Sequence, residues 1–342
     1  QRVWYVRDVV DGNNAAGGDG RSTNAFDSIA AFNAATTNDG DVIFVFRGNT
    51  GSTALSGGFT LKNGQKLWGE GIGLTVAPYG PLVPAGLQPR VNNGSGDAVS
   101  VPATAGSRQN VEVRGLDLTG SGNAVDVTAS GANAVGVLIS SNTISGAGVE
   151  GIDLNAGSTG AFAATVSGNT ITSTGNGVDA RTSAATTMTL DLSNLTVTSN
   201  GTGILVDGAG GGTTTITGFA NNVVSGNTLG TGISVNVARF DAVPGGAFDT
   251  VSGGTTTVGA SGNGVGASGV VLTSVSGDLS FTDLDVYADA GAGLRASGTT
   301  AYTGSAGLRI AVGAGVGTIE ATGGPAVDVT QATLGLPLSS IR

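Results

Sequence analysis

Short stretches in which apolar and polar residues alternate recur along the chain, most regularly between residues 110 and 237. In GIDL at 151–154, strand geometry places Ile152 and Leu154 on one face and Asp153 on the other. The phrase returns with small variations as NAVDV at 123–127, EGIDL at 150–154, NGVDA at 176–180, TGILV at 202–206 and TGIS at 231–234. The pattern predicts a series of short strands, each with one buried face.

The spacing of these phrases predicts the fold. From Ala124, the second residue of the first phrase, successive phrases follow after 27, 26, 26 and 29 positions. A repeat of this length is typical of solenoids, and its alternating Val, Ile and Thr residues favour strands over helices. Such units bury their inward residues only by stacking on one another. The prediction is therefore an all-β fold: a right-handed, single-stranded parallel β-helix (β-solenoid) with coils about 4.8 Å apart.

A second phrase keeps pace with the first, as SSNTIS at 140–145, SGNTIT at 167–172, LSNLTV at 192–197 and SGNTLG at 225–230. Its Asn falls where the backbone turns before a strand, and Asn tolerates the left-handed conformation that such turns use. Stacked at one corner of the solenoid, these side chains are predicted to bond one another in a ladder. The predicted ladder consists of Asn142, Asn169, Asn194 and Asn227.

The first 75 residues differ from the rest. VWYV at 3–6 and VIFVF at 42–46 read as strands, and between them lies NAFDSIAAFNAAT at 24–36. We interpret this segment as a short amphipathic helix that starts at the capping residue Asn24 and presents Phe26, Ile29 and Phe32 on one side. An open coil exposes its core and unpaired backbone, so the helix is predicted to cap the N-terminal end.

We divide the chain into three segments: 1–75, with the first strand, the capping helix and the first coils; 76–109, a Pro/Gly-rich loop and an early coil; and 110–342, the regular coils. The prolines from Pro78 to Pro102 indicate a loop that leaves the rod, and residues 239–254 a second one. No helix pattern follows the last coil phrase, AVDVT at 326–330. We therefore expect the C-terminal end to continue, to self-associate or to be covered by a partner.

Composition narrows the function classes. The 342 residues include 62 Gly but no Cys and no His, and the net charge is −10. Without His or Cys, serine or cysteine triads and zinc sites are excluded. An acidic chain repels phosphate backbones, so we expect no nucleic-acid partner. No apolar run reaches the roughly 18 residues that span a bilayer, so we expect no transmembrane segment.

The N-terminal segment also carries a family resemblance. FDSIAA at 26–31, GDVIFVFRGNT at 40–50 and LKNGQKLWGEG at 61–71 resemble the entry segment of bacterial right-handed β-helix proteins of the pectate-lyase-like superfamily, above all those of large exported surface proteins. The resemblance implies an extracellular or bacterial outer-surface location. It also implies that the outward face after the Asn phrase is a carbohydrate cleft, in which carboxylates bind Ca²⁺ or act as acid and nucleophile.

In successive coils Asp126, Asp153 and Asp179 take the same outward position, and Arg181 is placed to neutralise them. These four residues are the candidate catalytic set, and the three aspartates are a candidate Ca²⁺ site. Against catalysis, the hydrolytic members' signatures include a His that this chain lacks, and no Trp or Tyr lies between Tyr79 and Tyr287 to grip a sugar. The alternative interpretations of these residues are a structural salt-bridge ladder and a column of solvated surface charges.

We interpret the chain as a non-catalytic, exported structural or adhesive rod of a bacterial cell surface, with other protein subunits or a cell-surface polysaccharide as partners and no required cofactor. The alternative is a carbohydrate-active enzyme, a polysaccharide lyase or hydrolase, that uses the aspartate column. The second alternative is a scaffold subunit docked on a larger membrane complex.

Overall fold

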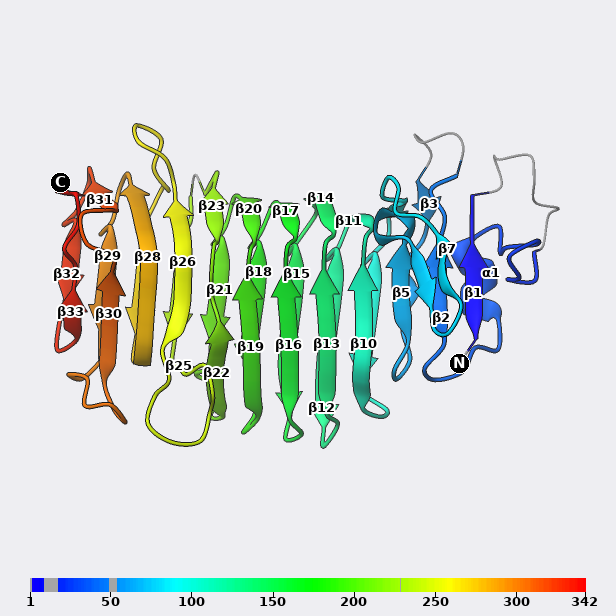
Figure 1. The fold of residues 1–342 in the computed structure, drawn as a ribbon, viewed down its shortest axis with the longest axis horizontal. Helices are drawn as coiled ribbons and strands as arrows, with labels where there is room; N and C mark the ends of the chain where they lie inside the picture. Colours follow the sequence, from blue (N-terminus) through cyan, green and yellow to red (C-terminus); the bar gives the residue numbers. More distant parts are fainter. Residues whose placement is uncertain (1, 9–17, 49–53, 228) are drawn as a thin grey trace.

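The computed structural model describes residues 2–8, 18–48, 54–227 and 229–342. The chain winds into a parallel β-solenoid whose coils stack side by side along the long axis (Figure 1). The predicted all-β fold is confirmed, while its right-handed sense stays a prediction. The pairing register repeats the spacing of the sequence phrases, since Val125 pairs with Ile152, Ile152 with Val178 and Val178 with Ile204.

Ten strands form one wall of the solenoid. From the N-terminal to the C-terminal end they are β4 (Phe59–Thr60), β9 (Val99–Ala103), β12 (Val125–Gly131), β15 (Ile152–Ser158), β18 (Val178–Thr182), β21 (Ile204–Asp207), β24 (Ile233–Asn236), β27 (Val270–Thr273), β29 (Leu294–Ser297) and β32 (Val327–Val329). Every neighbouring pair is parallel and in register, so each outward side chain lies beside its counterpart in the next coil.

A 22-stranded sheet supplies the other two walls. Its strands are β1 (Val3–Val6), β2 (Val42–Val45), β3 (Leu55–Ser56), β5 (Lys66–Gly69), β8 (Arg90–Asn93), β10 (Arg108–Arg114), β11 (Asp117–Gly120), β13 (Val135–Ser140), β14 (Thr143–Ala147), β16 (Phe162–Ser167), β17 (Thr170–Ser173), β19 (Thr187–Ser193), β20 (Thr196–Ser199), β22 (Thr213–Gly218), β23 (Val223–Ser225), β25 (Arg239–Phe240), β26 (Val251–Val258), β28 (Ser276–Ala288), β30 (Leu308–Val312), β31 (Thr318–Ala321), β33 (Thr333–Gly335) and β34 (Ser340–Ile341). A typical coil uses two of these strands and one from the ten-stranded sheet, as β13, β14 and β15 do.

One continuous hydrophobic core fills the solenoid from Val6 to Ile319. Along β15 the inward residues Ile152 and Leu154 are fully buried, whereas the outward residue between them, Asp153, is half-buried. Each such Ile or Leu contributes about 2 kcal/mol of hydrophobic stabilisation. Because a coil can bury these groups only against its neighbours, the register of the stack follows from the inward pattern.

The glycine at the second position of the recurring phrase has a steric cause. A Cβ on Gly177 would lie 2.1 Å from Val197 Cγ1 and 2.5 Å from the carbonyl oxygen of Gly203. The same crowding against a neighbouring side chain and the next coil's backbone recurs at Gly151, Gly203, Gly232, Gly269 and Gly293. The repeat therefore keeps glycine where successive turns approach most closely.

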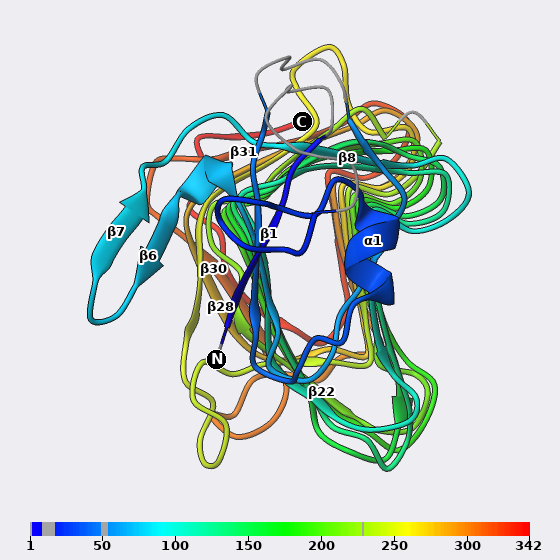
Figure 2. The ribbon, with the colours of Figure 1, turned by 90° about the vertical axis from the view of Figure 1, so that its right-hand side faces the viewer.

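The N-terminal helix is shorter than expected and starts later. Helix α1 spans Ile29–Ala34, and its N-cap is Ser28, whose hydroxyl accepts the Ala31 N–H at 3.2 Å. The expectation that Asn24 caps the helix is wrong, because the backbone of Asn24 closes a turn with Arg21 instead. Phe26 precedes the helix and packs between the rings of Trp4 and Phe32. Figure 2 places α1 along one side of the first coils, and its role as a cap stays a prediction.

The proline-rich segment leaves the rod only in part. After the short 3-10 helix η2 (Glu70–Ile72), strands β6 (Leu74–Val76) and β7 (Gly80–Val83) form an antiparallel hairpin that projects from the coil (Figure 2). Leu74 packs with Val42 and Phe44 on the outer face of the first coils. Residues 90–93 and 99–103 then return to the coil as β8 and β9, because Val91, Val99 and Val101 are fully buried.

The C-terminal end of the described chain is the outer edge of the last coil. Strands β32, β33 and β34 each pair on one side, with β29, β30 and β31. Leu334 and Ile341 are exposed on this coil. This is the edge where the sequence predicts self-association or a partner. Among the described residues, no helix has the length and apolar character needed to cross a membrane.

Candidate functional site

The three candidate aspartates lie side by side on the outer face of the ten-stranded sheet. Asp126 in β12 is in register with Asp153 in β15, which is in register with Asp179 in β18. Their inward neighbours belong to the hydrophobic core, so the backbone on which the carboxylates stand is rigid. The adjacent outward column holds Asn155, Arg181 and, after it, Asp207. We call Asp126, Asp153 and Asp179 the aspartate column.

Asp153 has the most perturbed carboxyl of the column. Burial is the main cause, and the negative charges of Asp126, Asp179 and Glu150 add to it. Together they raise the pKa of Asp153 from 3.8 to about 7, although Arg181 opposes the shift. Like charges on adjacent strands repel, and partial burial strengthens the repulsion. Asp153 therefore exchanges its proton near neutral pH.

The two outer members of the column are better compensated. Burial raises the pKa of Asp126, but both of its carboxylate oxygens accept the hydroxyl of Thr128, at 3.1 and 3.2 Å. Burial also raises the pKa of Asp179, while one oxygen accepts the Asn176 amide at 2.8 Å and the Arg181 guanidinium at 2.6 Å. The remaining oxygen of Asp179 is buried and accepts no hydrogen bond.

Arg181 is bound within its own strand. It pairs with Asp179, two residues earlier, and its side chain is 52% exposed whereas that of Asp179 is 3% exposed. One guanidinium thus serves a column of three carboxylates. Carboxylates are good Ca²⁺ ligands, but within residues 2–8, 18–48, 54–227 and 229–342 no group of three or more acidic side chains is arranged to hold a metal ion. Calcium at the column stays a prediction of the sequence.

The turns before β9, β12, β15, β18 and β21 carry a second ladder, which the sequence pattern does not predict. Asp97 accepts the backbone N–H of Asn123, Asn123 that of Glu150, Glu150 that of Asn176, and Asn176 that of Thr202. Each oxygen therefore reaches one coil further along the rod. The only sequence signal for this ladder is a polar residue just before the Gly or Ala of each phrase. The type of this residue changes from coil to coil, so the ladder does not stand out as a repeat.

The four asparagines of the predicted ladder do not all occupy the same position of the coil. Asn142 and Asn169 are buried and bonded, with the Asn142 amide donating to the Asn169 carbonyl at 3.1 Å. The left-handed residue is the one before each of them, Ser141 or Gly168. Asn194 itself takes this left-handed position and accepts the side-chain amide of Asn221 at 3.0 Å.

The next buried asparagine of this corner is Asn222, which accepts the Leu195 N–H. Asn227 lies at another turn and donates to Ser199 and Gly201. The structure therefore brings together two of the four predicted residues, Asn142 and Asn169. The phrases containing Asn194 and Asn227 are out of phase with theirs, because the chain between phrases varies in length.

Comparison with known proteins gives a family. Residues 10–230 match the family described as "Protein of unknown function (DUF1565)". The chain belongs to this family. No curated protein matches the chain.

Two solved structures of a GH136 lacto-N-biosidase from Eubacterium ramulus are similar to the chain in fold. The selenomethionine derivative and the native protein are each 12% identical to it, with TM-scores of 0.35 and 0.30, over 98% of this chain and 68% of that chain.

Proposed function

We propose that the chain is a structural and adhesive rod of a bacterial cell surface, and that it carries out no catalysis. The observation that supports the proposal is the single core that runs from Val6 to Ile319 through coils in continuous parallel register. The ten strands of one wall alone give a length of about 45 Å at the usual strand spacing. In a stack of this kind each coil unfolds cooperatively with its neighbouring coils. The rod therefore resists proteases and keeps its length.

One observation favours a second candidate, a carbohydrate-active enzyme. Glycosidases pair a protonated carboxyl with an ionised one, and retaining members hold the two groups about 5 Å apart. Asp153, with a pKa of about 7, stands between two other carboxylates on strands with parallel spacing. In this candidate Asp153 is the proton donor and Asp126 or Asp179 the ionised partner.

One experiment separates the two functions. The purified chain and its Asp153→Asn variant are incubated with immobilised acidic and neutral polysaccharides, and retention, new reducing ends and unsaturated sugars are measured. In parallel, the free chain is treated with proteinase K. The rod proposal expects a protease-resistant chain, retention of a polysaccharide without products, and no effect of Asp153→Asn. Products that disappear in Asp153→Asn would establish the enzyme instead, and rapid digestion with no retention would overturn the rod.

A further inference from the structure

The hairpin of β6 and β7 projects from the first coils of the rod (Figure 2) and presents large apolar side chains to solvent. Tyr79, at its turn, is 77% exposed, Leu82 in β7 is 50% exposed, and Leu87, just after the hairpin, is 67% exposed. Soluble proteins rarely gather several such side chains on one projecting segment unless something binds there. The hairpin is therefore a candidate interaction surface.

The segment around these side chains has very little polar surface. No charged residue lies between Gly71 and Pro89. Ten residues from Thr75 to Leu87 are exposed, and among them only Thr75 and Tyr79 have a polar atom in the side chain. The other eight are Ala, Gly, Leu or Pro. The exposed surface of the hairpin is therefore apolar, apart from two hydroxyl groups of the kind that suits a boundary between water and hydrocarbon.

The backbone of the hairpin is also suited to an apolar environment. Pro78, Pro81 and Pro84 have no N–H group, and the N–H of Tyr79 donates to the carbonyl of Val76 at 2.8 Å. Backbone donors without partners make entry into hydrocarbon costly. The prolines and the turn bond reduce the number of such donors at the tip of the hairpin.

The base of the hairpin is fixed to the rod. Leu74 is fully buried and packs with Val42 and Phe44 on the outer face of the first coils. After β7, the N–H of Gly86 donates to the carbonyl of Glu70 at 2.8 Å and holds the returning segment. The apolar tip is therefore presented in a defined position, so binding costs little free energy in ordering the chain.

The net charge of the chain lies away from the hairpin. Residues 1–90 contain seven Lys or Arg and seven Asp or Glu, so residues 91–342 carry the whole net charge of −10. A membrane surface with anionic headgroups repels an acidic protein. This repulsion acts on the later coils, whereas the end of the rod that bears the hairpin is neutral.

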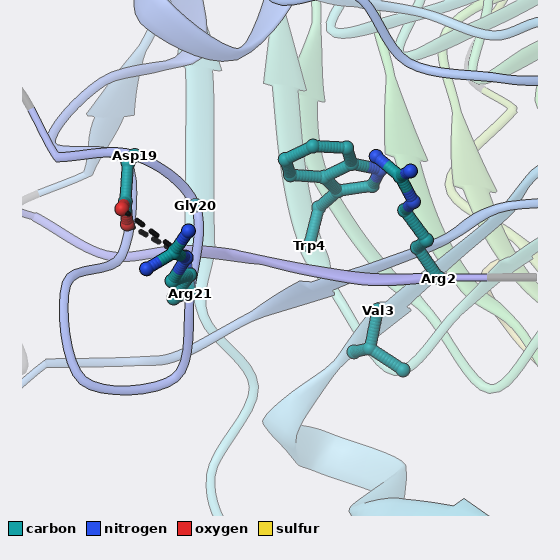
Figure 3. A pocket seen from close by; sticks show the side chains of 6 residues that line it. All are labelled: Arg2, Val3, Trp4, Asp19, Gly20 and Arg21. Atoms are coloured by element: carbon teal, nitrogen blue, oxygen red, sulfur yellow. Dashed lines mark hydrogen bonds and ion pairs between the residues drawn. The ribbon is translucent and has the colours of Figure 1, made fainter.

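The cavity at the same end of the rod has balanced charges. It has a volume of about 490 Å³ and is lined by Arg2, Val3, Trp4 and residues 19–21 (Figure 3). Arg21 pairs with Asp19 at 3.4 Å, and Asp41 accepts the backbone N–H of Arg2 at 2.9 Å and the indole N–H of Trp4 at 2.8 Å. Because its basic groups lie beside acidic ones, the cavity does not attract an anionic headgroup.

We propose that the β6–β7 hairpin binds a lipid surface, by inserting Tyr79, Leu82 and Leu87 at the boundary between headgroups and acyl chains. Burial of these side chains supplies the free energy of binding, and the amphipathic ring of Tyr79 suits this depth. The hairpin lies in the surface and does not cross the bilayer. This role goes beyond the adhesive one, because it attaches the N-terminal end of the rod to a membrane.

A lipid surface fits these observations better than a protein partner does. A stable protein interface uses about 20–30 residues a side and about one hydrogen bond per 100–200 Å². The hairpin exposes ten residues with two side-chain hydroxyl groups. A second copy that added a strand to β7 would need backbone N–H groups in that strand, where Pro81 has none. Acyl chains require neither a large area nor polar partners.

The test is co-sedimentation of the full chain with sucrose-loaded vesicles at low and at physiological salt. One set of vesicles is phosphatidylcholine, and the other is equal parts of phosphatidylcholine and phosphatidylglycerol. We expect saturable binding to phosphatidylcholine that salt changes by less than about twofold, because the hairpin contains no charged residue. The mixed vesicles should bind no more tightly, because the chain as a whole is acidic.

Leu82→Ser and Leu87→Ser should each weaken binding to phosphatidylcholine by about five- to tenfold, because each Leu transfers apolar surface from water to lipid. Val243→Ser is the matched control, since Val243 is also 67% exposed but lies in the loop between β25 and β26. Arg21→Gln, at the cavity of Figure 3, is the control for charge. Both controls should change binding by less than about twofold.

A fluorescent probe at the turn reports insertion directly. Tyr79→Trp should show emission at shorter wavelength when vesicles are added, and quenching by lipids that carry bromine in their acyl chains. Val243→Trp is the matched probe and should show neither change. A signal in both variants would mean that the chain associates with vesicles without using the hairpin.

Three results would overturn lipid binding by the hairpin: no binding to either vesicle, equal losses in Leu87→Ser and Val243→Ser, or binding that needs phosphatidylglycerol and disappears with salt. Self-association of the free chain that Leu82→Ser abolishes would assign the hairpin to a second copy and refute lipid as its partner. Vesicle binding is measured independently of protease resistance and polysaccharide retention, so the hairpin and the rod proposals can each fail alone.

Discussion

One column of outward positions on the ten-stranded sheet has contrasting chemistry in its two halves. In the first half, Asp126, Asp153 and Asp179 stand beside one another. In the second half the same column continues through Leu205, Ser234, Val271, Arg295 and Asp328. There the one carboxylate faces a guanidinium, with 3.5 Å between Arg295 and Asp328.

The backbone register is equally regular in both halves, so the fold does not require stacked carboxylates. Inward positions are restricted to residues that fill the core, whereas outward positions accept Asp, Leu, Ser, Val or Arg at the same place. The aspartate column is a local electrostatic cost on a scaffold that would stack without it. Variants that alter this cost in one half, with matched variants in the other, test the contrast.

The largest expected effect comes from Arg181→Gln. Asp179 is buried, and the substitution removes its only ion-pair partner among the described residues, at 2.6 Å. Breaking a buried pair is strongly destabilising, but Arg181 is half-exposed, so we expect a loss of about 2 kcal/mol at pH 8. The loss should shrink at pH 5, where Asp179, with its raised pKa, takes up a proton more readily.

The matched variant is Arg295→Gln. Arg295 and its ion-pair partner Asp328 are both about half exposed. It should change the free energy of unfolding by less than about 0.5 kcal/mol. Urea denaturation at both pH values measures the two variants. Equal losses in Arg181→Gln and Arg295→Gln would show that burial of Asp179 does not matter, and the contrast would fail.

The second effect is a gain in stability from Asp153→Asn. The pKa of Asp153 is about 7 in the folded chain and near 3.8 when unfolded, so between these values the folded state binds more protons. Stability from this group is therefore greatest below about pH 4 and is lost as the pH rises toward 7. For a fully buried group, a pKa shift from 3.8 to about 7 would lower the free energy of unfolding by about 4 kcal/mol once the carboxyl is ionised. Solvent screening of a half-buried group reduces the expected gain at pH 8 to about 1–2 kcal/mol.

At pH 4 the gain from Asp153→Asn should vanish, because the wild-type carboxyl is then neutral in the folded state. Asp328→Asn, in the same column but opposite Arg295, is the control and should show no gain at either pH. Thermal denaturation across pH 4–8 gives both comparisons. A gain that does not depend on pH would mean that charge is not its cause.

The coil stack and the aspartate column were predictable from the sequence because both depend on one quantity, the spacing of the inward residues. Once Ile152 pairs with Val178, strand geometry fixes Asp153 beside Asp179. The same reasoning misplaced Asn194 and Asn227, since the phrases that contain them are offset within the coil. Helix α1 is capped by Ser28 rather than Asn24 because capping depends on which polar side chain reaches a free N–H of the first turn, here that of Ala31.

Features that depend on contacts between distant segments could not be read from the pattern. The turn ladder of Asn123 and Glu150 uses side chains of different length to reach the next coil's backbone. Asp41 orients Trp4 across 37 residues, through the pairing of β1 with β2. The pKa of Asp153 depends on how deeply the carboxyl is buried, which the alternation of residues does not specify.

The smallest expected effect extends the column by one carboxylate. Leu205 follows Asp179 in register and lies two residues before Asp207, so Leu205→Asp places a new charge beside both. Leu205→Asn is the matched variant, because it has the same size and loses the same apolar contacts without the charge. We expect Leu205→Asp to be less stable than Leu205→Asn by about 0.5–1 kcal/mol at pH 8, the usual range for like charges on adjacent strands. The difference should fall toward zero at pH 4 as the carboxyls take up protons. Urea denaturation of the pair at both pH values measures it, and an equal stability of the two variants at pH 8 would mean that Arg181 and solvent already screen the column, so that its two halves differ in composition but not in energy.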